Sequence, residues 1–160
     1  MEQAYAAIGR AVRAAQVFET ILVPIFEFFK MQTEPGYLEK TGGYIPAGAF
    51  KVPVRNVIKL LGAKGQIAPD LEVTLDSYVE ARHLLIHKWF QEHGWPNDND
   101  TEGFAPVIEL ASRVERDATA LTRLFAGYMA EFGKPEWAAA TAEDYRARAA
   151  AIFHSVQKDE

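Results

Sequence analysis

An all-α fold, a bundle of four to five helices, is the fold class that this 160-residue sequence predicts. Apolar residues recur at helical spacing along almost the whole chain, and glycine and proline separate the periodic stretches. Strand character is confined to the short stretches 37–38 and 44–45, which flank a Thr-Gly-Gly sequence. The length favours one domain over residues 1–160, with one core.

The first helix is expected over residues 2–31, because the sequence Glu34-Pro35-Gly36 stops it. A long Gly- and Pro-rich loop is expected to follow, over about residues 33–50. Loops of that length without secondary structure of their own are uncommon in compact domains, and they are often functional.

The remaining helices are expected at about residues 53–62, 69–92, 101–132 and 141–158. Pro53 and Pro69 suit the first turn of a helix, where the missing N–H costs nothing. Gly133 ends the fourth helix, and Thr141 caps the last one ahead of two acidic residues that complement the positive helix end.

The composition excludes several classes of protein. Without cysteine there is no disulfide framework, no thiolate metal site and no cysteine nucleophile. The longest apolar run, residues 21–26, is too short to span a bilayer, and Met1-Glu2-Gln3 lacks the basic head of a secretory signal. A cytoplasmic protein without membrane contact is therefore expected.

The charge is unevenly distributed along the chain. The net charge of −5 argues against a protein that coats nucleic acid through bulk electrostatics. Residues 40–69, however, contain no acidic residue, and they predict a local basic face that comprises Lys40, Lys51, Arg55, Lys59 and Lys64. The alternative is an ordinary solvated helix surface.

The first helix carries two apolar faces. One follows Ile8 and Val12, and the other comprises Val17, Ile21, Ile25, Phe28 and Phe29. A helix that is apolar almost all round is buried on both sides. A homodimer is the predicted cover for the second face, and the alternative is that later helices of the same chain enclose it.

Two opposite charges interrupt apolar stripes. Arg82 lies in the middle of the apolar face of the third helix, and Glu19 lies likewise on the first. Each charge would be costly without a partner, so a buried Glu19–Arg82 ion pair is predicted.

A separate line of polar residues follows the third helix: Asp76, Glu80, His83 and His87. Acids one turn before histidines stabilise the imidazolium form, which suits proton transfer near neutral pH. Two alternatives remain open at this point. One is an ordinary polar face, and the other is a metal site in which His83 and His87 are joined by Glu80 or Asp76.

Residues 75–90, LDSYVEARHLLIHKWF, resemble the signature helix of the HEPN superfamily, whose motif is an arginine, usually a polar residue next, and a histidine four to six residues on. Here the motif reads Arg82-His83-Leu84-Leu85-Ile86-His87. The resemblance covers about residues 4–92 and includes AAQVFETIL in the first helix and PVRNVIKLLG in the second.

The resemblance implies a helical bundle that dimerises so that two motif helices meet. Its catalytic members are metal-independent RNA endonucleases without cofactors, and others bind nucleic acid or partner proteins in toxin–antitoxin and defence systems. Carried over, His87 is the acid/base, Arg82 stabilises the phosphate, and His83, where asparagine is commoner, orients it. An antitoxin or other protein and RNA are the implied partners.

A conflict remains at Arg82. If Glu19 occupies the guanidinium in the core, the motif serves the fold, and the chain is a non-catalytic module that binds a partner protein or nucleic acid. If Arg82 faces a cleft, it can bind a phosphate as well. The sequence leaves both interpretations open, and it contains no GxxxxGK[ST] or GxGxxG loop for a nucleotide.

Overall fold

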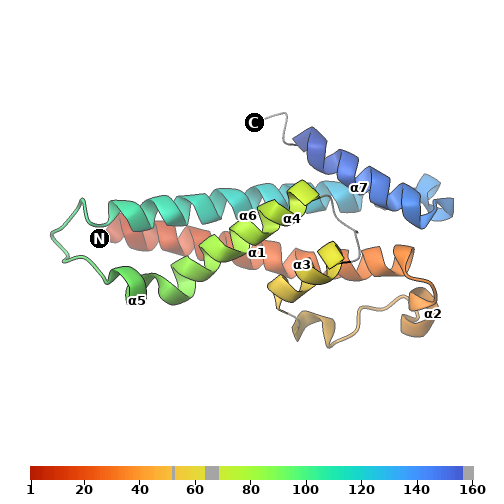
Figure 1. Ribbon diagram of the computed structural model, residues 1–160, viewed down its shortest axis with the longest axis horizontal. Coiled ribbons are helices and arrows are strands. Elements are labelled where there is room, and N and C mark those ends of the chain that lie inside the picture. Colours follow the sequence, from red (N-terminus) through yellow and green to blue (C-terminus); the bar gives the residue numbers. More distant parts are fainter. Residues whose placement is uncertain (52, 64–68, 157–160) are drawn as a thin grey trace.

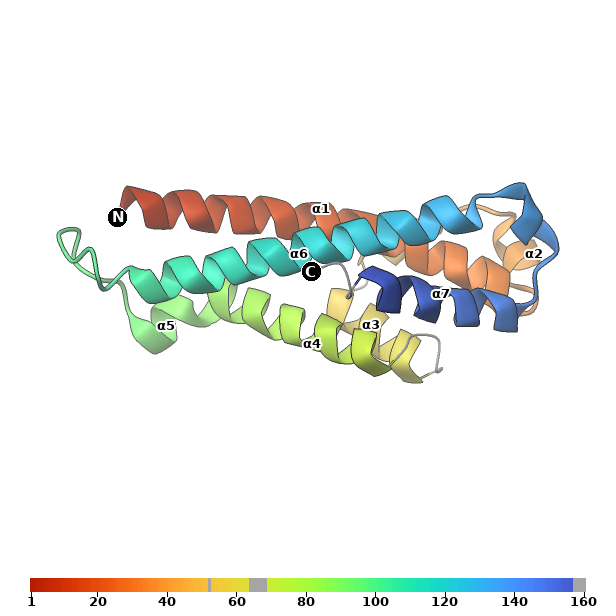
Figure 2. The same cartoon turned by 90° about the horizontal axis from the view of Figure 1, so that it is seen from above.

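Two long helices, α1 (Glu2–Thr33) and α6 (Ala105–Phe132), lie side by side and run in the same direction in the computed structural model (Figures 1 and 2). The structure describes residues 1–51, 53–63 and 69–156. Ring contacts follow the parallel course: Phe18 of α1 lies 5.8 Å from Phe125 of α6, and Phe29 lies 6.1 Å from Tyr128. The two helices form the axis against which the other elements pack.

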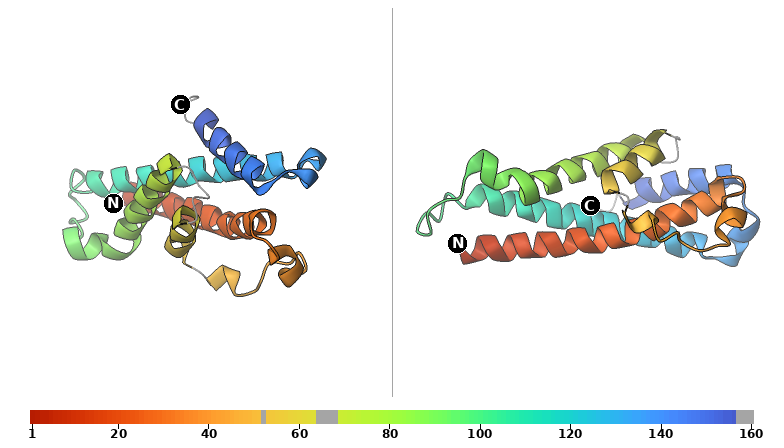
Figure 3. Two further views of the ribbon diagram at one scale, coloured as in Figure 1. Left: turned by 45° about the vertical axis from the view of Figure 1, so that its right-hand side comes forward. Right: turned by 90° about the horizontal axis from the view of Figure 1, so that it is seen from below.

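The chain between these two helices returns in the opposite direction. The helix α4 (Pro69–His83) continues through a π-helical segment, η2 (Leu84–Lys88), into α5 (Trp89–His93). The helix α3 (Val54–Ala63) packs against α4 and α1. After a 3₁₀ turn, η3 (Pro135–Ala139), α7 (Ala142–Val156) runs back along the end of α6 and diverges from it toward its C-terminus (Figure 3, left).

The all-α prediction is confirmed, with no strand in the described ranges. The segment after α1 differs from the expected loop. Tyr37 and Leu38, which had strand character, lie in a short helix, α2 (Tyr37–Thr41), and residues 44–45 are irregular. Gly36, with a φ of 73°, allows the reversal from α1 into α2 because glycine tolerates the left-handed region. A further 3₁₀ turn, η1 (Ala49–Lys51), precedes α3.

The fourth predicted helix begins later than expected, at Ala105 rather than Thr101. Residues 97–104 form turns instead, in which Asp100 Oδ1 accepts a hydrogen bond of 2.9 Å from the Gly103 N–H. A Cβ at Gly103 would lie 2.3 Å from Asp100 Oδ2, so a larger residue there would displace the Asp100 carboxylate. The aspartate side chain thus satisfies a backbone donor within the turn that precedes α6.

The core is a single cluster of buried side chains from α1, α3, α4, η2, α6 and α7. It covers the second apolar face of α1, which was expected to need another subunit. Ile25 and Phe29 are buried, Phe28 contacts Tyr145 of α7, and only Val17 on that face remains largely exposed. The alternative, enclosure by later helices of the same chain, therefore accounts for most of this face. None of the helices in the described ranges combines the length and hydropathy needed to cross a bilayer.

Two tyrosines in this core predict an alkaline limit to stability. Tyr78 and Tyr128 are buried, and neither hydroxyl has a hydrogen-bond partner among the described residues. Burial raises the pKa of both phenols above the ordinary value. The unfolded chain loses these protons above about pH 10 while the folded chain keeps them, so the free energy of unfolding falls as pH rises further. Urea titrations at increasing pH will measure the decline, which Tyr78→Phe should reduce.

Candidate functional site at residues 82 to 87

The helix that carries the Arg-x4-His motif contains a π turn at the motif itself. The chain passes from α4 into η2 without a break, and the Trp89 N–H donates to the Leu84 carbonyl, five residues earlier. Bonds of this kind replace the four-residue spacing of an α-helix, and such turns occur frequently at functional sites. The turn begins directly after Arg82 and His83, and it contains His87.

The π turn brings Arg82 and His87 together. In a regular α-helix residues five apart point about 140° away from each other. Here Arg82 Nη1 lies 3.3 Å from His87 Nε2. A guanidinium can only donate, so a hydrogen bond at this contact requires His87 Nε2 as the acceptor. The motif's two principal residues thus form one site, although helical periodicity placed them on different faces.

The predicted Glu19–Arg82 pair is present, but it is half-buried rather than buried. Arg82 Nε lies 3.0 Å from Glu19 Oε1, and Nη2 lies 3.4 Å from Oε2. The two side chains are 29% and 25% exposed. Glu19 therefore holds one edge of the guanidinium, while Nη1 on the other edge faces His87. A single side chain therefore makes both contacts, and the Glu19 pair leaves Nη1 for another partner.

We expect Glu19 and Arg82 to be energetically coupled by more than about 1 kcal/mol. The two contacts and the partial burial favour coupling above that of a fully exposed pair. A double-mutant cycle with Glu19→Gln and Arg82→Gln, measured by urea unfolding, tests this value. The matched control is the Arg10–Glu115 pair, which also joins two helices but is 57% and 34% exposed, and its coupling should be smaller. Additive effects at Glu19 and Arg82 would show that the pair adds nothing to stability.

A pocket of about 340 Å³ lies beside this pair, between α1, α3 and α4. Its walls come from these residues: Glu19, Pro53, Val54, Arg55, Val79, Arg82 and His83. Arg82 and His83 therefore face a space open to a ligand, with an apolar side formed by Pro53, Val54 and Val79. His87 itself is exposed at the surface.

The two acids that were expected to support the histidines are placed differently. Glu80 forms an ion pair with Arg55 of α3, and Asp76 is exposed. No contact in the described structure joins either acid to an imidazole. The rings of His83 and His87 instead lie 5.2 Å from each other. Glu80 therefore pairs with a cation on another helix, Arg55, rather than with a histidine one turn further along its own helix.

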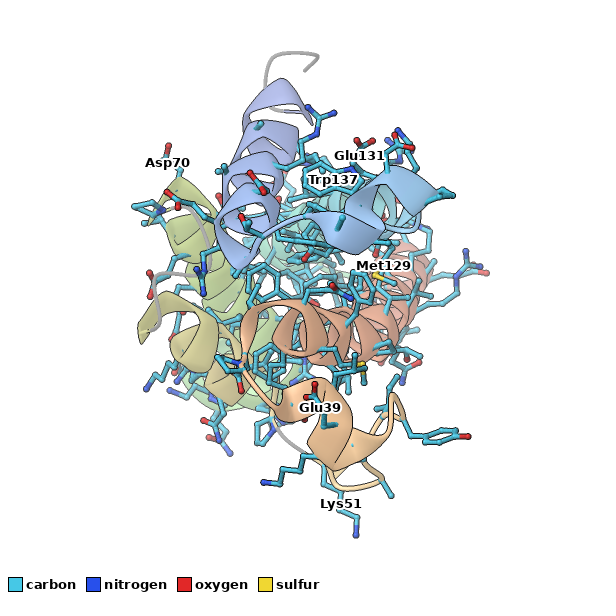
Figure 4. All side chains as sticks on the ribbon, turned by 90° about the vertical axis from the view of Figure 1, so that its right-hand side faces the viewer. Glu39, Lys51, Asp70, Met129, Glu131 and Trp137 are labelled. Carbon is cyan, nitrogen blue, oxygen red and sulfur yellow. The ribbon has the colours of Figure 1, made fainter. Side chains whose placement is uncertain are left out.

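The metal alternative finds no geometric support, since the described residues contain no group of three acidic or histidine side chains placed to hold one ion. The basic face is present in part. Lys40, Lys51, Arg55 and Lys59 are exposed, Lys51 points outward near α2 (Figure 4), and Lys64 lies outside the described residues. The Arg55–Glu80 pair reduces the positive charge of this face where it borders the pocket.

Sequence reasoning missed a second polar cluster at the other end of α1. The Glu27 side chain is 3% exposed, with Lys30 Nζ at 2.5 Å from Oε1 and the Tyr37 hydroxyl donating to Oε2 at 2.5 Å. Burial lowers the pKa of Lys30, but its contacts with Glu27 and Tyr37 outweigh burial and leave that pKa raised. The isolated glutamate in the apolar stretch 23–29 was a signal of this cluster. Its partner Tyr37 lay in the expected loop.

Comparison of the chain with protein-family models, curated proteins and solved structures finds no match. The geometry of the site and the motif resemblance are therefore the two indications of its function.

Proposed function

We propose that this chain is an HEPN-like, metal-independent RNA endonuclease whose site is formed by Arg82, His87 and His83. The contact between Arg82 Nη1 and His87 Nε2 supports this proposal most directly. It places a permanent cation, suited to a phosphate, beside an imidazole nitrogen of a side chain that is exposed to solvent.

The proposed chemistry follows from these two groups. When Arg82 Nη1 turns from His87 Nε2 to a phosphate oxygen, Nε2 becomes free to take the proton of a ribose 2′-hydroxyl, and the 2′-oxygen attacks the adjacent phosphorus. The bond from phosphorus to the 5′-oxygen breaks, and the leaving oxygen takes a proton from solvent water, which gives a 2′,3′-cyclic phosphate and a 5′-hydroxyl end. The His87 imidazolium then returns its proton to solvent. Arg82 neutralises the non-bridging oxygens as negative charge builds up on them. His83, on the wall of the pocket, orients the substrate.

A second candidate is a non-catalytic module that binds a partner protein or nucleic acid. The observation in its favour is that two of the three guanidinium nitrogens of Arg82 lie against Glu19. In that case the motif stabilises the packing of α1 against α4, and the pocket beside it has no chemical role. The two candidates differ in whether RNA is cleaved.

Homodimerisation and an antitoxin-like partner belong to the proposal as well. Ile86 and Phe90 flank His87 and are 37% and 71% exposed, which provides apolar surface next to the motif. A second copy that covers this surface would bring two motif segments together. Sedimentation at micromolar concentration should give twice the chain mass, and Phe90→Glu should give the monomer mass. A monomeric wild-type chain would contradict this part of the proposal.

The test of the enzyme function is cleavage of unstructured RNA in the presence of EDTA. The expected products carry 2′,3′-cyclic phosphate ends, and an oligonucleotide of the same sequence with 2′-deoxyribose should stay intact. Bound but uncleaved RNA would favour the second candidate. Cleavage that EDTA abolishes would contradict the metal-independent mechanism.

A further inference from the structure

A second pocket, of about 340 Å³, lies in the groove between α1 and α6 and shares no residue with the pocket beside Arg82. Its lining comes from these two helices alone: Arg10, Arg13, Ala14, Val17, Glu115, Thr119, Thr122 and Arg123. Three arginines around one hollow stand out in a chain whose net charge is −5. The proposed ribonuclease site uses none of these side chains.

The charges of this arginine pocket are only partly compensated. Arg10 Nε lies 3.2 Å from Glu115 Oε2, and Glu115 is the single carboxylate among the lining residues. Within the described chain, Arg13 and Arg123 have no ion pair, and both are exposed. Three guanidinium groups and one carboxylate leave an excess of two positive charges. Guanidinium groups present rigid sets of donors that match phosphate oxygens.

A hydroxyl group and an apolar floor complete the pocket. Thr122 Oγ1 is shielded from solvent and has no hydrogen-bond partner among the described residues, whereas the Thr119 hydroxyl donates to the Glu115 carbonyl. A buried hydroxyl without a partner costs free energy, which a ligand oxygen would recover once the Thr122 side chain rotates its Oγ1 into the pocket. Ala14 packs on the core, and Val17 is 47% exposed, so together they offer an apolar surface beside the arginines.

We propose that the arginine pocket binds a small phosphate monoester with an apolar group. The phosphate lies between Arg13 and Arg123, and its apolar part rests on Ala14 and Val17. A phosphate monoester carries a charge of about −1.5 to −2 at pH 7, which matches the excess charge of the pocket, whereas a carboxylate brings only one negative charge. The proposal stands independently of the ribonuclease function, because the two pockets have no lining residue in common.

The experiment is calorimetric titration of the full chain with phenyl phosphate, with benzoate as the singly charged comparison. We expect saturable binding of phenyl phosphate, at least about tenfold tighter than that of benzoate. In the Arg13→Gln/Arg123→Gln variant the affinity should fall at least about tenfold, because two charge-assisted contacts are lost. The exposed Arg116 lies on α6 but outside the lining, so Arg116→Gln is the matched control and should bind as the wild type does.

A third variant separates ligand binding from a general effect of charge. Thr122→Val removes only the unpartnered hydroxyl and should weaken phenyl phosphate severalfold without loss of stability, since no internal hydrogen bond is broken. Absence of saturable binding to the wild type would overturn the proposal. Equal affinity in the double variant and the Arg116→Gln control would also overturn it, as would equal affinity for benzoate and phenyl phosphate.

Discussion

RNA cleavage by the His87→Ala variant is expected to be at least about a hundredfold slower than cleavage by the wild type, with folding unchanged. His87 supplies the only imidazole nitrogen held against Arg82 in the described structure, and its loss removes the proton acceptor while Arg82 and Glu19 stay paired. The side chain is exposed, so little packing is lost with it. Single-turnover cleavage in EDTA measures the rate, and circular dichroism measures the helix content.

The matched control for this variant is His93→Ala. His93 is also an exposed histidine just after the π turn, with its ring 4.3 Å from that of Trp89, and it lies away from the Arg82 contact. We expect His93→Ala to cleave RNA at close to the wild-type rate. Equal rates for His87→Ala and the wild type would contradict the proposed acid/base role. A comparable loss in both variants would show that the segment, rather than one imidazole, is required.

In the proposed site Arg82 would serve both stability and chemistry. Its guanidinium has two edges, and Glu19 lies against Nε and Nη2 while Nη1 reaches His87. Glu19 thus fixes the direction of the side chain without occupying the nitrogen that faces the imidazole. In the proposed mechanism this orientation lowers the entropic cost of binding a phosphate, because the cation is already in place.

Helical periodicity predicted the helices and the Glu19–Arg82 pair because both depend on the regular 100° step of an α-helix. This regularity holds along α1 and α4. A charge within the apolar stripe of one helix is there expected to pair with an opposite charge in the stripe of the other, as Glu19 and Arg82 do. The prediction from periodicity fails at residues 84–88, where the π turn has more residues per turn than an α-helix. A helical wheel therefore could not predict the contact between Arg82 and His87. Only the motif resemblance associated the two residues.

The second apolar face of α1 shows a different limit. Periodicity correctly identified that face as buried, but it does not say which surface covers it. The helix α7 is joined to α6 by a turn that returns it onto α1, and Tyr145 packs on Phe28 and Phe132. The direction in which α7 runs depends on the connection after Gly133. The pattern of apolar residues along α1 carries no information about that connection. The cover thus came from the same chain.

The Glu27→Ala variant is expected to lose about 3 kcal/mol of the free energy of unfolding, the largest effect that we predict for a charged residue. Glu27 is a buried carboxylate with two short contacts, and its removal leaves the Lys30 ammonium, whose side chain is only 15% exposed, without its counter-charge. The Tyr37 hydroxyl, which joins α2 to α1, loses its acceptor as well. Urea unfolding at neutral pH measures the change.

Glu39→Ala provides the control, because Glu39 is an exposed glutamate on α2, the helix that Glu27 holds, and it faces outward at that end of the molecule (Figure 4). Its loss should change stability by less than about 0.5 kcal/mol. The Tyr37→Phe variant separates the two contacts of Glu27, since it keeps the ring over which Lys30 lies at 4.5 Å but removes the hydroxyl, and it should cost about 1 kcal/mol. A Glu27→Ala effect no larger than that of Glu39→Ala would mean that Lys30 reaches solvent once its partner is gone, as a long flexible side chain allows. In that case α2 is held to α1 by apolar packing rather than by the buried charge pair.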